Sequence, residues 1–135
     1  MVAAARGHKN LGDLLGPLER EVMAIMWRSG PLSVPEVHAR IGRRRAPLAY
    51  TSVMTVMSRL NDKGILERQK AGRGYVYRAV ADREGTLGIL ARQHARTLID
   101  DFGDLAVSGF VSEVGDDPTT LRLLEQLLER GERRD

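Results

Sequence analysis

The chain contains no cysteine, few aromatic residues and no long apolar run. The absence of cysteine excludes disulfide bonds, thiolate metal sites and cysteine nucleophiles. With two Phe, three Tyr and one Trp, a hydrophobic core has to be built mainly from aliphatic side chains and methionine. No stretch approaches the roughly 18 consecutive apolar residues of a membrane-spanning helix, and residues 1–10 lack the apolar run of a signal peptide. We therefore expect a cytoplasmic protein without membrane insertion.

The charges are divided unevenly along the 135 residues. Residues 1–83 hold 15 Lys and Arg against 7 Asp and Glu, a net charge of +8, whereas residues 84–135 hold 6 against 11, a net charge of −5. The overall charge of +3 conceals this division. A basic segment joined to an acidic one indicates that the first binds a polyanion and that the second has a different task.

Residues 50–63 have the pattern of a helix that reads DNA. Val53, Val56, Met57 and Leu60 recur at i, i+3, i+4 and i+7 and form one apolar stripe. The opposite face carries short hydroxyl side chains, where a solvated helix would more often carry Lys and Glu, which are better helix formers. Because Ser and Thr side chains can contact base edges in the major groove, we interpret this segment as a recognition helix.

Two helices are expected before the recognition helix. Pro17 at a first helical position and the stop signal Ser-Gly-Pro at 29–31 predict the first of them. Ser33 and Glu36 match a capping box that opens the second helix, which we expect to end at Gly42. This order of helices is typical of a helix-turn-helix.

A basic hairpin is expected after the recognition helix, which Gly64 ends. Residues 65–70 and 75–80 have the pattern of two short strands, joined by the glycine-bearing loop 71–74. Basic side chains give this hairpin an edge suited to DNA phosphates, and so do the three consecutive arginines at 43–45. The predicted fold class is mainly α with a small β-wing, a winged helix-turn-helix followed by a helical region.

The helical region begins after residue 83. Leucines recur with the three-and-four spacing of one helical face over residues 84–101, and an apolar segment follows over 102–114. Asp117 as N-cap and Pro118 as the first helical residue predict a final helix. These segments hold more Leu and Val than short helices can bury alone, which favours a symmetric dimer over folding back on residues 1–83. The predicted dimer-interface residues are Leu87, Leu90, Leu98, Phe102, Leu105, Phe110, Val111, Leu121, Leu124, Leu127 and Leu128.

No combination of residues indicates catalysis, a metal site or a cofactor. The carboxylate pairs at 100–101 and 116–117 lie at expected helix boundaries, where acids cap the following helix. His8, His38 and His94 are scattered, without companions at ligand spacing, and we expect His38 to be a surface residue. We therefore predict that the protein is not an enzyme and needs no cofactor.

Several strings in the chain resemble the BlaI/MecI/CopY family of bacterial repressors. The resemblance covers about residues 11–130 and is most specific in the recognition helix. The strings that carry it are LEREVM at 18–23 followed by Trp27, AYTSVMTVMSRL at 49–60, Lys63-Gly64, YVY at 75–77, and Phe102-Gly103 through Phe110-Val111 with the leucine-rich helix after them.

This resemblance implies a homodimer with an N-terminal winged helix and a C-terminal three-helix dimerisation region, bound to an operator with dyad symmetry. Carried over by position, Thr51, Ser52 and Thr55 would face bases, with Arg59 and the hairpin near phosphates. In the β-lactam-responsive branch, a membrane sensor leads to cleavage of the repressor. The matching position is Asp101-Phe102, where those repressors have Asn before Phe. The copper-responsive branch ends in a cysteine cluster, so the absence of cysteine excludes thiolate copper sensing.

We therefore predict a dimeric transcriptional repressor of double-stranded operator DNA. It would have a flexible arm at 1–10, a winged-helix DNA-binding domain at 11–83 and a helical dimerisation domain at 84–135. The resemblance also implies a membrane sensor and protease system that acts on the repressor indirectly. The alternatives are a MarR-like or PadR-like ligand-responsive regulator, a winged-helix protein-interaction module without DNA and, most remotely, a metal-dependent enzyme. The predicted DNA contacts are Arg43, Arg44, Arg45, Tyr50, Thr51, Ser52, Thr55, Ser58, Arg59, Arg68, Lys70, Arg73 and Tyr77.

Overall fold

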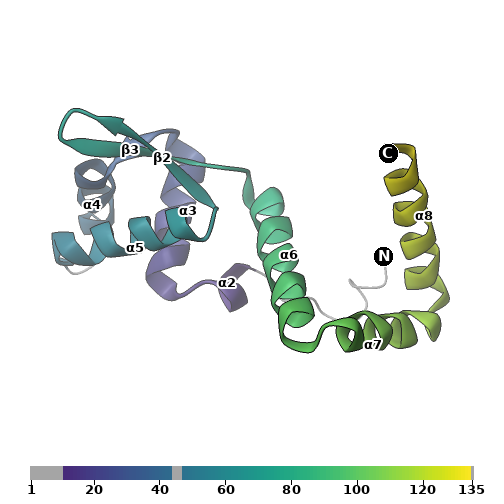
Figure 1. Ribbon diagram of the computed structural model, residues 1–135. Helices are drawn as coiled ribbons and strands as arrows, with labels where there is room; N and C mark the ends of the chain where they lie inside the picture. Colours follow the sequence, from purple (N-terminus) through teal and green to yellow (C-terminus); the bar gives the residue numbers. More distant parts are fainter. Residues whose placement is uncertain (1–10, 44–46, 135) are drawn as a thin grey trace. The chain divides into compact units, whose positions relative to one another are not determined.

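The computed structural model describes residues 11–43 and 47–134, and the chain divides into two compact units. Lys9–Ala91 forms one unit, and the other includes Arg92–Asp135. The arm predicted over residues 1–10 and the predicted phosphate contacts Arg44 and Arg45 lie outside the described residues. The elements of the first unit that precede helix α6 are α2 (Leu11–Leu14), α3 (Pro17–Ser29), β1 (Leu32–Ser33), α4 (Val34–Gly42), α5 (Tyr50–Asp62), β2 (Leu66–Ala71) and β3 (Gly74–Ala79) (Figure 1).

A three-stranded antiparallel sheet completes the winged helix, with the strand order β1-β3-β2. The hairpin of β2 and β3 was predicted, but β1 was not, because two residues are too few to show an alternating pattern. Leu32 of β1 pairs with Tyr77 of β3. The hairpin turn consists of Gly72 and Arg73 alone. Gly72 has φ 62°, which suits glycine at the first central position of such a turn.

The helix starts and stops follow the predicted signals. At the start of α4, the Glu36 N–H donates to Ser33 Oγ at 3.3 Å, and the Ser33 N–H donates to Glu36 Oε1 at 3.0 Å. At the start of α3, the Gly16 N–H donates to Glu19 Oε1 at 2.9 Å. Gly64, with φ 79°, follows the end of α5 in the left-handed conformation expected of a C-terminal stop.

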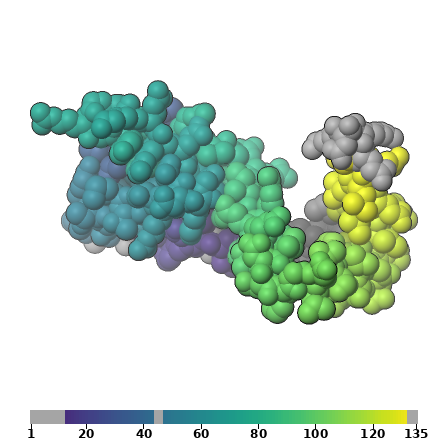
Figure 2. All heavy atoms as spheres, viewed as in Figure 1, coloured from purple at the N-terminus to yellow at the C-terminus, as the bar shows by residue number. Residues whose placement is uncertain are grey.

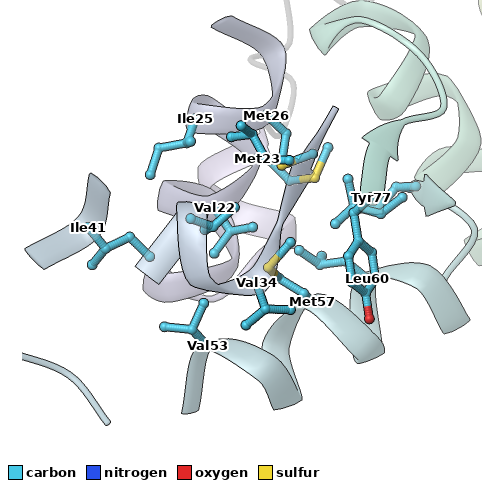
Figure 3. Packing of buried hydrophobic residues seen from close by; sticks show 14 of the residues in the cluster. Val22, Met23, Ile25, Met26, Val34, Ile41, Val53, Met57, Leu60 and Tyr77 are labelled. Atoms are coloured by element: carbon cyan, nitrogen blue, oxygen red, sulfur yellow. The ribbon is translucent and has the colours of Figure 1, made fainter. Parts of the chain in front are cut away.

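The core of the first unit is made mainly of aliphatic side chains and methionine, as the shortage of aromatic residues requires. Val22 and Met23 of α3 and Val53 and Met57 of α5 are fully buried. Figure 3 shows these side chains gathered in one cluster, with Tyr77 beside them. The predicted apolar stripe of residues 50–63 is therefore the face by which α5 packs on the rest of the unit.

Helix α6 (Arg83–Phe102) begins within the first unit. Thr86 is fully buried and Leu90 is 5% exposed, packed in the same core. The indole Nε1 of Trp27 donates to the Ala81 carbonyl at 2.9 Å and ties the segment before α6 to α3. The assignment of Leu90 to a dimer interface was wrong, because its side chain is buried in its own chain. The compact unit also extends past residue 83, where the sequence predicted the boundary.

The second unit contains the remainder of α6 with α7 (Asp104–Gly115) and α8 (Pro118–Arg134). Gly103, with φ 59°, separates α6 from α7. Asp117 caps α8 as predicted, since its Oδ1 accepts the Thr119 N–H at 3.2 Å. Among the helices of the described ranges, none combines the length and apolar character needed to cross a membrane. The predicted interface residues exposed in this unit are Leu98, Phe102, Leu105, Phe110, Val111, Leu121, Leu127 and Leu128, and Leu124 is half-buried.

Candidate nucleic-acid interface

Helix α5 has one buried apolar face and one exposed polar face. Val53 and Met57 are fully buried, whereas Thr51, Ser52 and Thr55 are exposed to solvent. Ser58 lies on the polar face and is half-buried, and Arg59 and Tyr50 are exposed. The hydroxyl groups predicted to face bases thus lie together on the side of the helix that is free of the core.

A hollow of about 830 Å³ lies between this polar face and the hairpin. Helix α5 contributes Thr55, Ser58 and Arg59 to its lining, and the hairpin contributes Arg68 and Arg73. The first turn of α4 and the residue before it also contribute to the lining. In the space-filling view, the hairpin tip projects from the body of the winged helix (Figure 2). The structure therefore joins the predicted reading helix and the predicted basic wing in one concave, cationic surface.

Met54 lines the same hollow and was not among the predicted site residues. Its side chain is exposed, although Met57, one turn further on, is fully buried. The spacing contained the signal, because Thr51, Met54, Thr55 and Ser58 recur at i, i+3, i+4 and i+7. Only hydroxyl and charged side chains were predicted as contacts on this face, so apolar Met54 was missed.

Tyr77 was predicted to contact DNA, and the structure corrects this assignment. The side chain is 2% exposed and belongs to the hydrophobic core. Its hydroxyl accepts a hydrogen bond from Arg68 Nη1 at 3.2 Å. The Arg68 guanidinium also lies 4.3 Å from the ring centroid of Tyr75, within the range of a cation–π contact. The two tyrosines therefore hold Arg68 in place on the side of the hairpin that faces the hollow.

The other predicted basic contacts are exposed on separate elements. Lys70 lies near the end of β2, and Arg73 occupies the turn, where its side chain is free of the core. Arg43 follows the last residue of α4 and is exposed. Arg78 forms a salt bridge with Glu67 on the neighbouring strand, so its charge is partly neutralised within the hairpin.

His38 links α4 to the start of α5. Its Nε2 lies 2.7 Å from the Leu48 carbonyl oxygen, so this nitrogen carries the proton and donates. The ring also meets Tyr50 edge-on, with centroids 5.8 Å apart. The sequence predicted a surface histidine, but the structure shows a half-buried side chain with a fixed partner. Because Ala49 at the N-cap of α5 has no side-chain capping group, this tertiary contact helps to fix the entry to the helix.

Comparison with known proteins identifies the family of the chain. The family model of the penicillinase repressor matches residues 15–130. The transcriptional regulator BlaI from two strains of Mycobacterium tuberculosis is 36% identical over 120 residues, which cover 87% of this chain and 86% of that protein. A solved structure of the DNA binding domain of the repressor BlaI is 28% identical, covers 50% of this chain and 82% of that domain, and has a TM-score of 0.46. The chain, a transcriptional regulator by homology and not an enzyme, belongs to the penicillinase repressor family.

Proposed function

We propose that the protein is a homodimeric transcriptional repressor that binds double-stranded operator DNA with dyad symmetry. Helix α5 would lie in the major groove, with Thr51, Ser52 and Thr55 at base edges. Lys70 and Arg73 of the hairpin would contact the phosphate backbone and hold the helix in register. The observation that carries the proposal is one hollow that Thr55 of α5 and Arg73 of the basic hairpin both line.

The homology supports the same function. The relative named transcriptional regulator BlaI aligns with this chain over 86% of its own length, so the likeness extends past the winged helix into the second unit. A DNA ligand also accounts for the net charge of +8 over residues 1–83, because cations that neutralise phosphates release counterions and drive binding. Binding to DNA would put its site of action in the cytoplasm.

The exposed apolar side chains of the second unit support the homodimer. Leu105 is 73% exposed, and Leu98, Phe102 and Phe110 are also exposed. Apolar surface of this extent on short helices is favourable only when a partner covers it. A second copy is the partner that a two-fold operator requires, because each winged helix then meets one half-site.

We also propose the Asp101–Phe102 bond as the point where proteolysis would end repression. The Asp101 side chain is exposed near the end of α6, and the break at Gly103 follows the bond. Cleavage there would separate the winged helix from α7 and α8 and remove most of the apolar surface proposed for the dimer. A membrane sensor with its protease would then act on the repressor indirectly, without membrane insertion of this chain.

Selection from a random-sequence DNA pool tests the proposed function. The full-length protein would be incubated with random duplexes, and bound DNA would be amplified over several rounds at moderate salt. We expect the pool to converge on a sequence with dyad symmetry, with half-sites about one helical turn apart or a multiple of it. A pool that stays random after repeated rounds would contradict sequence-specific DNA binding.

A further inference from the structure

Met54 is a large apolar side chain at the edge of the polar face of α5, on the side that borders the hollow. It is 43% exposed and lines the hollow beside Thr55 and Ser58. Met57, three residues later on the same helix, is fully buried in the core. The exposure of Met54 is therefore a property of the face on which it lies and not of a loosely packed helix.

The chemistry of the major groove gives this side chain a specific counterpart. Hydroxyl groups such as that of Thr55 can donate to or accept from several bases, so they discriminate weakly between base pairs. The C5-methyl group of thymine is the apolar group exposed at the base edges of the major groove. A methionine side chain is flexible and polarisable, so its tip can pack on a small apolar group that a shorter side chain on the same helix would not reach.

We propose that Met54 determines specificity by packing its thioether end against the methyl group of one thymine in each half-site. This inference rests on the proposed function, because it requires α5 to lie in the major groove. Thr51, one turn before Met54, and Thr55, the next residue, bond to neighbouring base edges and fix the depth of the helix. Met54 then supplies the distinction between thymine and cytosine in that position, which a hydroxyl group alone does not provide.

A deoxyuridine scan tests the proposal, because deoxyuridine pairs as thymine does and lacks only the methyl group. The probe is the duplex selected by the full-length wild-type protein, with each thymine of one half-site replaced in turn. Burial of one methyl group changes affinity about fourfold. We expect the wild-type protein to lose about fourfold in affinity at one position of the half-site and to be unaffected at the others.

The variants Met54→Ala and Met54→Gln identify the side chain that senses the methyl group. Both keep a good helix former at an exposed position, so folding is retained. We expect each variant to bind the thymine duplex and the deoxyuridine duplex equally well at the sensitive position. Val80→Ala is the matched control, because Val80 is also 43% exposed but does not line the hollow. This control should keep the full fourfold sensitivity.

The outcomes separate this inference from the function on which it rests. A scan without any sensitive position, for a protein that still prefers its selected duplex, would overturn the role of Met54 and leave the repressor function intact. Sensitivity that persists in Met54→Ala would also overturn it and would assign the contact to another side chain, with exposed Tyr50 the first to test. If the wild-type protein selects no sequence at all, the proposed function itself fails.

Discussion

The Nζ of Lys63 lies 2.8 Å from Oε2 of Glu19 and joins the end of α5 to the start of α3. Lys63 is the C-cap residue of α5, and Glu19 also accepts the Gly16 N–H at the start of α3. One carboxylate therefore serves both the capping of α3 and the contact between the two helices. This ion pair helps to fix the angle between α5 and α3.

The stability of the winged helix should fall in acid because of Glu19. Burial raises the pKa of this carboxyl, but the hydrogen bonds from Lys63 and Gly16 and the charges of Lys63 and Arg59 outweigh it, so the pKa lies below 4.5. A lowered folded-state pKa adds stability above the unfolded value, and this stability is lost as the pH falls through the folded value. The loss should be at most about 1 kcal/mol, since Lys63 is partly exposed.

Urea unfolding at several pH values measures this effect. The wild-type protein should lose stability steadily as the pH falls below about 4.5. Glu19→Gln should be less stable at neutral pH and should show a flatter dependence over the same range. Parallel curves for the two proteins would show that Glu19 does not carry the acid sensitivity.

Replacing His38 should lower sequence preference. His38→Phe keeps a ring edge beside Tyr50 but loses the donor to the Leu48 carbonyl. A lost hydrogen bond of this kind is worth about 1 kcal/mol, so we expect about a fivefold fall in the ratio of operator to random-duplex affinity. The slope of affinity against salt should not change, because no phosphate contact is removed. His38→Gln restores a donor, so it should recover part of the preference. Equal preference in all three proteins would deny His38 a role in positioning α5.

Substitutions in the hairpin and in α5 should have different effects on DNA affinity and base preference. Arg73→Ala and Lys70→Ala should weaken binding to every duplex alike and reduce the salt slope by about 0.9 for each lost phosphate contact. Thr55→Ala should keep the slope and alter the base preference at the position that Thr55 contacts. Competition titrations at several salt concentrations distinguish these cases. A Thr55→Ala protein that selects the same duplex as the wild type would show that this side chain reads no base.

Truncation should show where the winged helix ends. A chain ending at Ala91 keeps the buried Thr86 and Leu90, whereas one ending at Arg83 loses both. Burial of a leucine side chain contributes about 1.5–3 kcal/mol, so the shorter chain should be less stable by at least that amount in urea unfolding.

Sedimentation should find both truncated chains monomeric and the full-length chain dimeric. If the chain ending at Ala91 dimerised, the dimer contacts would have to lie in the winged helix.

Local sequence signals predicted most of the fold. The caps at Ser33 and Asp117, the stop at Gly64 and the apolar stripe of α5 each depend on residues a few positions apart, so they can be recognised without tertiary information. The errors concern contacts over longer distances. Leu90 has the spacing of an interface residue, and its burial depends on packing against the winged helix.

In the predicted site, too, the errors concern residues whose role depends on contacts between distant parts of the chain. Tyr77 lies on an alternating strand, and its burial depends on the packing of that strand against the helices of the core, which the alternation alone does not show. His38 becomes a positioning residue only because the chain returns to it at Leu48. Met54, in contrast, could have been found from its spacing alone.

The most direct test of the central claim is a fluorescence anisotropy titration of full-length protein with its selected duplex and with a scrambled duplex of the same composition. Measured at several salt concentrations, the selected duplex should be preferred by about a thousandfold or more near physiological salt. Both affinities should fall steeply as salt rises. Equal affinity for the two duplexes, or no dependence on salt, would contradict sequence-specific recognition by the polar face of α5 and the basic hairpin.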